Sequence, residues 1–121
     1  RKGDWQGYQG QDFEAVIDMQ KETVIHSIDA TFLQDSRSWI LMPTKVEYYV
    51  STDNVNFILV GTVENDINPK ETENKIKNFI LSKEIIAKFV KVKAYNFGKL
   101  PEWHQGFGGD AFIFIDEITI K

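Results

Sequence analysis

Residues 46–57 read Val46-Glu47-Tyr48-Tyr49-Val50-Ser51-Thr52-Asp53-Asn54-Val55-Asn56-Phe57. Apolar side chains stand at every second position of the first five residues, and this period of two predicts a half-buried strand. The polar run that follows is typical of a hairpin connection, with Asn54 at the place where glycine is most often found. The pattern therefore indicates two antiparallel strands joined by a short turn.

The same alternation recurs along the chain. Further strands are predicted at residues 13–18, 27–32, 57–63, 76–81, 90–94 and 111–120. Polar loops connect them, the longest from Glu64 to Lys75, and only Ser82 to Lys88 is compatible with a turn or two of helix. Residues 111–115 are apolar on both parities, which predicts a place inside the sheet. Seven or so short strands predict an all-β sandwich.

Length and composition limit the class of protein. The chain has 121 residues, no cysteine and a formal net charge of −4. We expect residues 1–121 to form a single domain, since no internal repeat appears. The acidic balance argues against nucleic acid or an anionic membrane as partner. Without cysteine there are no disulfides, thiol catalysis or zinc–thiolate sites. No apolar run is long enough for a membrane span. No signal peptide is seen, and the start at Arg1 is typical of a segment taken from a longer chain.

Residues suited to catalysis are few. His26 shares the parity of the apolar residues in its predicted strand, so we expect a structural histidine near the edge of the core. Asp116 and Glu117 are adjacent on a predicted strand, where their side chains would face opposite sides and could not act as an acid–base pair. No nucleophile elbow, phosphate loop or zinc-helix motif occurs. We therefore expect a protein that is not an enzyme by itself.

Two predicted loops, residues 32–39 and 98–110, carry large aromatic rings beside polar groups. A flat ring packs on the apolar face of a sugar, while amide, carboxylate, guanidinium and imidazole groups bind its hydroxyls. The candidate ligand-binding residues are Gln34, Asp35, Arg37, Trp39, Trp103 and His104. The alternative is equally open for each tryptophan: Trp39 and Trp103 would close the ends of the sandwich instead.

Several short segments occur together in one family. They are Phe13-Glu14-Ala15-Val16-Ile17-Asp18, the hairpin at 46–57 and Phe114-Ile115-Asp116-Glu117-Ile118. In these the chain resembles the coagulation factor V/VIII type C, or discoidin, superfamily, and within it the carbohydrate-binding modules of family 32. Trp5-Gln6-Gly7, Phe32 to Asp35 with Ser38 to Ile40, and Leu100 to His104 are similar to the C-terminal domain of bacterial chitobiase-like family 20 β-N-acetylhexosaminidases.

The resemblance implies a galactose-binding-domain-like jelly-roll β-sandwich of eight strands, with a ligand site on the loops at one end. It also implies that this chain lacks the N-terminal strand and loop of the domain. Members commonly hold a structural calcium ion, which implies Glu117 as an oxygen ligand with Asp116 beside it. The remaining part of that calcium site would lie upstream of residue 1.

We expect a non-catalytic, monomeric carbohydrate-binding module of a periplasmic or extracellular glycoside hydrolase. It would bind terminal galactose or N-acetylhexosamine weakly, with a Kd of roughly 0.1–1 mM. The alternative is a structural accessory domain that packs against the catalytic domain and binds no ligand, and exposure of Trp39 and Trp103 separates the two. Adhesion to phospholipid or protein ranks last, because Arg37 is the only basic residue near Trp39 on its loop and the chain is acidic.

Overall fold

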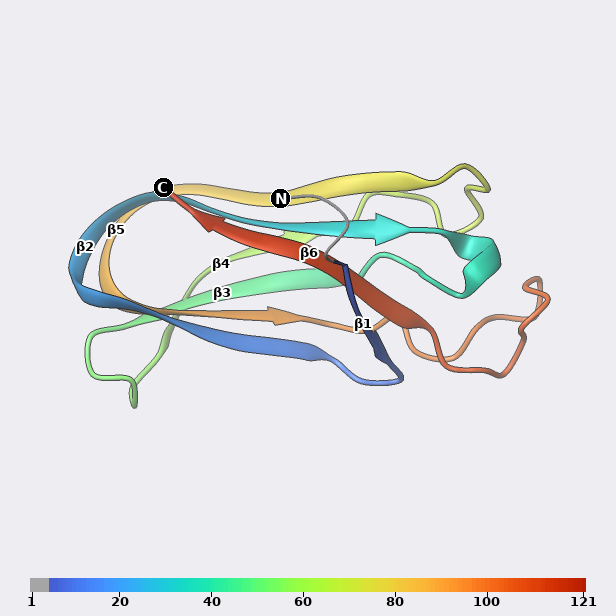
Figure 1. Ribbon diagram of the computed structural model, residues 1–121, viewed down its shortest axis with the longest axis horizontal. Helices are drawn as coiled ribbons and strands as arrows, with labels where there is room; N and C mark the ends of the chain where they lie inside the picture. The colour runs from blue at the N-terminus through green and yellow to red at the C-terminus, as the bar shows by residue number, and fades with distance from the viewer. Residues whose placement is uncertain (1–4) are drawn as a thin grey trace.

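A computed structural model describes residues 5–121, which form antiparallel strands and one short 3-10 helix (Figure 1). The elements are β1 (Gln6–Gln9), β2 (Phe13–Gln34), η1 (Ser36–Ser38), β3 (Lys45–Ser51), β4 (Ile58–Glu64), β5 (Lys75–Ala94) and β6 (Phe112–Ile120). The strand order is β1-β6-β2-β5-β3-β4. Within these residues no helix has the length and apolar composition needed to cross a membrane. The predicted all-β class is confirmed.

Strands β2 and β5 are long enough to serve both layers of a sandwich. They run side by side and curve together around one end of the molecule, at the left of Figure 1. Residues 13–18 pair with 89–94 in one layer, which β3 and β4 extend. Residues 27–34 pair with 75–82 in the other layer, which β6 and β1 extend. Because β2 and β5 each contribute one segment to both layers, the six strands provide the eight strand segments that the resemblance implied.

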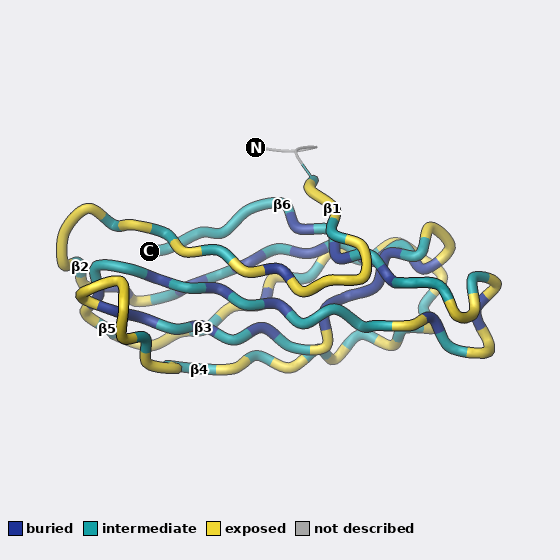
Figure 2. Tube along the Cα trace, turned by 90° about the horizontal axis from the view of Figure 1, so that it is seen from below, coloured by how far each residue is buried: buried dark blue, intermediate teal, exposed yellow. Residues whose placement is uncertain are grey.

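The core lies between the two layers and is made by every second residue of the strands (Figure 2). Phe32 and Phe79 meet edge to face with ring centroids 5.3 Å apart, and Ile113 is fully buried beside them in the same cluster. Tyr48, on β3 in the opposite layer, donates its hydroxyl hydrogen to the main-chain oxygen of Phe79. Apolar burial and this hydrogen bond together fix one layer on the other.

Residues 82–88, predicted as a possible helix, belong instead to the bend of β5. There Ile85 pairs with Ile25 of β2. This pairing satisfies backbone groups that a helix would satisfy internally, and β-branched side chains favour it, so the partner strand outweighs a weak local preference. For the same reason the segments predicted at 13–18 and 27–32 are one continuous strand.

Register shifts explain two more differences from the predicted pattern. His26 is exposed and not at the core edge, because a shift between Ile25 and Ser27 breaks the alternation. A second shift, between β2 and β6, inserts an extra residue into β6 near Asp116 and Glu117. These two side chains were expected on opposite faces, yet both line one cavity. Bulges of this kind re-aim side chains and leave no mark in the local sequence pattern.

The predicted hairpin between β3 and β4 is confirmed. The hydroxyl oxygen of Ser51 accepts hydrogen bonds from the backbone N–H groups of Asp53 and Asn54, at 3.1 and 3.0 Å. Asn54 has φ 62°, a left-handed conformation that asparagine tolerates better than most residues. The turn therefore closes through side-chain hydrogen bonds although it contains no glycine.

Candidate functional site

Three connections converge at the end of the sandwich opposite the bends, at the right of Figure 1. They are the turn around η1, the loop between β4 and β5 at residues 65–74, and the loop between β5 and β6 at residues 95–111. All three follow or precede core strands, so the sandwich fixes their bases while leaving their tips in solvent. They enclose a pocket lined by Ser36, Arg37, Lys70, Thr72, Trp103, His104 and Gln105, with a volume of about 360 Å³. We call this the rim pocket.

Trp103 presents its indole at the rim pocket. Its side chain is 43% exposed, and its ring centroid lies 5.9 Å from that of His104. The ammonium nitrogen of Lys70 lies 5.5 Å from the indole centroid. A cation over an indole at an exposed site contributes about 0.5–1 kcal/mol, so a ligand can displace this lysine at little cost. The structure thus supports an accessible ring for Trp103.

Trp39, expected as a second open platform, is half-buried and supports the neighbouring loop. A side chain added at Gly106 would place its Cβ 2.6 Å from Cε2 of the indole, and one at Gly109 would lie 2.7 Å from Cζ3. The ring also packs against a small core cluster that includes Leu100 and Ala111. Trp39 has φ 70°, a rare conformation for a bulky residue, held in place by this packing. The face of its indole that meets the glycines is closed to a ligand.

His104 is predicted to bind a hydroxyl, but the residue is only 5% exposed and both ring nitrogens are used within the chain. Nδ1 accepts from the N–H of Gly106 at 2.8 Å, so Nε2 carries the hydrogen and donates to the oxygen of Ser36 at 2.6 Å. The amide of Gln105 donates to the oxygen of Arg37 at 2.9 Å. These bonds dock the Trp103 loop onto the turn around η1.

Gln34 and Asp35 also act within the chain. Gln34 is 1% exposed, and its amide donates to the oxygen of Asn68 at 3.0 Å and accepts from the N–H of Met42 at 3.2 Å. Asn68 in turn accepts from the N–H of Lys70 at 2.9 Å, so Gln34 positions the turn that carries this lysine. Asp35 accepts from the hydroxyl of Ser38 at 3.0 Å and does not line the pocket.

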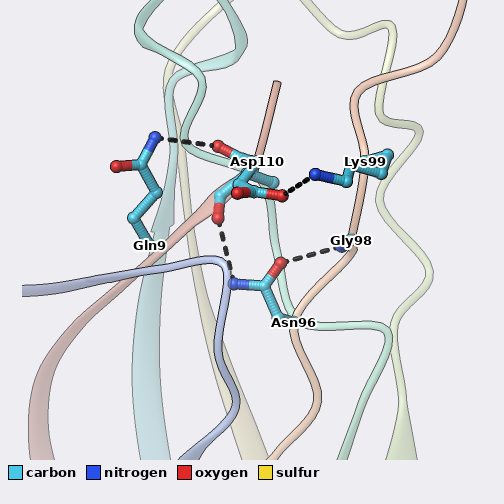
Figure 3. Close-up of polar contacts among 6 residues, drawn as sticks. Gln9, Asn96, Gly98, Lys99 and Asp110 are labelled. Carbon is cyan, nitrogen blue, oxygen red and sulfur yellow. Dashed lines mark hydrogen bonds and ion pairs between the residues drawn. The ribbon is translucent and has the colours of Figure 1, made fainter. Parts of the chain in front are cut away.

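Asn96 holds the base of the 95–111 loop (Figure 3). Its amide donates to the oxygens of Ala111 at 3.0 Å and Gln11 at 3.1 Å, and its oxygen accepts from the N–H of Gly98 at 2.8 Å. Beside it, Lys99 forms an ion pair with Asp110 at 2.7 Å. Sequence reasoning missed this residue, although asparagine two positions before a glycine is a signal for a side-chain-closed turn.

The pocket residues missed from the sequence are Ser36, Lys70, Thr72 and Gln105. Ser36 and Gln105 lie within the two aromatic loops predicted to bind a ligand, but their residue types alone do not distinguish them from other polar loop residues. Lys70 and Thr72 lie in a polar, charged loop with no aromatic residue, so nothing local marks them as neighbours of Trp103. The only signal in that loop is the pair Asn68-Pro69, which is typical of a turn.

A second cavity, of about 260 Å³, contains the two acidic residues expected at the calcium site. Gln6, Asp116 and Glu117 are among its lining residues, and Glu117 accepts from the hydroxyl of Thr119 at 3.3 Å. Calcium takes six to eight oxygen ligands. No group of three acidic or histidine side chains suited to a metal occurs among residues 5–121. Acidic side chains of the described residues thus supply only part of a calcium ligand set, and calcium stays a prediction.

Comparison with known proteins identifies the family. The sequence pattern of the F5/8 type C domain matches residues 1–109. The chain belongs to the F5/8 type C domain family. No curated protein matches this F5/8 type C domain. The resemblance drawn from the hairpin and the flanking strands is confirmed.

Solved structures share the fold of this F5/8 type C domain. CBM32-1 from a family 31 glycoside hydrolase of Clostridium perfringens has a TM-score of 0.59 at 22% identity, covering 98% of this chain and 79% of that one. The C-terminal domain of a chitobiase from Bacteroides fragilis has a TM-score of 0.50 at 18% identity, covering 91% and 65%. CpGH89CBM32-5 from C. perfringens, in complex with GalNAc-β-1,3-galactose, has a TM-score of 0.50 at 16% identity, covering 97% and 94%. At these identities the likeness shows the β-sandwich fold.

Proposed function

We propose that this F5/8 type C domain is a non-catalytic carbohydrate-binding module and that the rim pocket is its sugar site. The observation that carries the proposal is the exposed indole of Trp103 at a pocket whose other side chains are hydrogen-bond donors. The indole would pack on the apolar C–H face of a pyranose, and Arg37, Thr72 and Gln105 would bind its hydroxyls. An open pocket with one stacking ring corresponds to a weak Kd, roughly 0.1–1 mM.

Similar structures support this proposal. One is a module of a glycoside hydrolase, one is part of a chitobiase, and one is a complex with GalNAc-β-1,3-galactose. We propose on this basis that the domain belongs to a secreted glycoside hydrolase of the β-N-acetylhexosaminidase type, in the periplasm or outside the cell. Tethering would raise the local concentration of substrate for the catalytic domain.

Titration of the domain with galactose, N-acetylglucosamine and N-acetylgalactosamine tests the sugar site. We expect binding of at least one of them, and Trp103→Ala should weaken it at least about tenfold, because stacking supplies much of a weak sugar affinity. Phe107 is the matched control, since it is an aromatic residue on the same loop, 63% exposed, that does not line the pocket. Phe107→Ala should leave the Kd within about twofold. Flat titrations with all three sugars, on folded protein, would contradict the proposal.

The second candidate is a structural accessory domain that packs against the catalytic domain and binds no ligand. Ile58 and Ile86 favour it: both are exposed, and both line a cavity of about 220 Å³ at the end of the sandwich opposite the rim pocket. Exposed apolar side chains that lie together on a surface, rather than singly, are typical of docking sites. This candidate predicts that acrylamide quenching of Trp103 fluorescence is unchanged by any sugar.

The proposed monomeric state and the expected calcium ion are tested separately. Sedimentation equilibrium should give the mass of one chain, 14.0 kDa. Thermal unfolding in excess calcium and in excess chelator measures the metal's contribution, because a ligand that binds only the folded state raises the unfolding temperature. A higher unfolding temperature in calcium would support the ion, and equal temperatures would contradict it.

A further inference from the structure

The charged side chains that line the rim pocket have one sign. Arg37 comes from η1 and Lys70 from the loop between β4 and β5, and none of the described lining residues is acidic. The chain as a whole carries a net charge of −4. The pocket is therefore locally positive on a molecule whose net charge is negative. This is the electrostatic pattern of a site for an anionic group.

The acidic residues nearest in sequence do not neutralise these two cations. Asp35 lies two residues before Arg37, Glu71 follows Lys70 and Glu102 precedes Trp103, but none of the three lines the pocket. Other lysines of the same region do have acidic partners, as in the pair of Lys77 with Asp66 at 3.1 Å. Within residues 5–121, neither Arg37 nor Lys70 forms an ion pair, and the Lys70 ammonium lies over the indole ring of Trp103. Both charges are available to a ligand.

We propose that the saccharide taken by the rim pocket carries an anionic substituent, either the carboxylate of a uronic acid or a sulfate ester. This inference rests on the proposed sugar-binding function and narrows its ligand class. The planar guanidinium of Arg37 matches two oxygens of either group, and Lys70 adds a point charge. Thr72 and Gln105 remain for hydroxyls, and Trp103 for the ring face. A neutral sugar would bring no counter-charge to either cation.

Titration of the domain with galactose, galacturonic acid and galactose 6-sulfate at low ionic strength tests the inference. We expect one or both acidic sugars to bind about 3- to 10-fold more tightly than galactose, as two partly exposed charge pairs allow. Their advantage should shrink at about 0.3 M salt, because exposed charges are screened. Sodium acetate and sodium sulfate at the same concentrations should not compete. Tighter binding of galacturonic acid would identify a carboxylate as the preferred anionic group, and tighter binding of galactose 6-sulfate would identify a sulfate ester.

Two variants and one control locate the effect. Arg37→Gln and Lys70→Gln should each reduce the ratio of the galactose Kd to the acidic-sugar Kd about 2- to 3-fold. Lys21→Gln removes the same charge from an exposed lysine of β2, between the segments 13–18 and 27–34 that belong to the two layers, and should change neither Kd.

Two outcomes would overturn the inference, and they are distinguishable from failure of the proposed function. If galactose binds as tightly as both acidic sugars, the ligand is a neutral sugar. If the preference survives in the Arg37→Gln/Lys70→Gln double variant, these two cations are not its source. In both cases the sugar site itself remains. If none of these sugars, nor the two N-acetylhexosamines, binds to folded protein, the sugar site is wrong and the inference falls with it.

Discussion

Each side chain near the rim pocket either lines the pocket or stabilises a loop by hydrogen bonds, and its residue type does not indicate which of these roles it has. Trp103 and Arg37 line an open pocket, whereas Gln34 and His104 are buried with their polar atoms bonded inside the chain. Buried polar groups need such partners, so a histidine in a glycine-rich loop has as much physical reason to stabilise the loop as to bind a ligand. Only the neighbouring segments decide between these roles.

Glu47 permits a prediction on pH. Its carboxylate accepts hydrogen bonds from the hydroxyls of Tyr95 at 2.6 Å and Tyr49 at 2.7 Å, which lower the pKa of Glu47 below its ordinary 4.5. Because the folded pKa is the lower one, this stabilisation is present above about pH 4.5 and is lost as the pH falls through the folded pKa. Glu47→Gln should lower the free energy of unfolding at pH 7 by about 1 kcal/mol, because the glutamine oxygen can still accept from the two hydroxyls while the charge is lost.

Urea unfolding of wild type and Glu47→Gln between about pH 3 and pH 7 measures this difference. The gap between the two proteins should close as the pH approaches 3. A gap that stays constant over the range would mean that the charge of Glu47 does not contribute.

At the scale of elements, the strands and turns that depend only on neighbouring residues in the sequence could be predicted. Alternation from Val46 to Val50 and the polar turn at 51–56 are local, and both are confirmed. The bend at 82–88 and the register shift near Glu117 were not predictable, because the partner strand β2 creates them. The burial of Trp39 depends in the same way on glycines about 70 positions further along the chain.

Asn96 permits a prediction for the loop as an element. Asn96→Ala removes the hydrogen bonds that tie residues 97–110 to Gln11 and Ala111, which should cost about 2 kcal/mol of stability and weaken sugar binding, since the loop carries Trp103. Lys99→Gln at the same junction removes only an exposed ion pair and should cost less than about 1 kcal/mol.

Thermal unfolding and limited proteolysis of the two loop variants measure this difference. We expect faster cleavage within residues 97–110 in Asn96→Ala than in Lys99→Gln. Equal cleavage rates would show that the loop is held from its tip, through His104 and Trp39, and not from its base.

For the whole molecule, the two layers are joined in two ways. β2 and β5 pass from one layer into the other, and side chains of both layers fill a single core cluster. A layer cannot unfold alone without exposing that shared core and breaking two long strands at their bends. We therefore expect the sandwich to unfold in one cooperative transition, as small single domains usually do.

Tyr48 tests this coupling, because its hydroxyl on β3 bonds the main-chain oxygen of Phe79 in the opposite layer and the side chain is fully buried. Tyr48→Phe leaves that oxygen without this donor, which should cost about 1–2 kcal/mol and lower Tm by roughly 3–8 °C. Tyr49→Phe makes the same change on the other face of β3, and it should cost less because Glu47 keeps its bond from Tyr95.

Circular dichroism in the far and near ultraviolet follows the backbone and the aromatic packing of these two variants separately. The two signals should change together in Tyr48→Phe, at one lowered Tm, and sugar affinity should be unchanged because Tyr48 does not line the rim pocket. If the near-ultraviolet signal is lost well before the far-ultraviolet signal, the layers separate before they unfold, and the shared core is not what couples them.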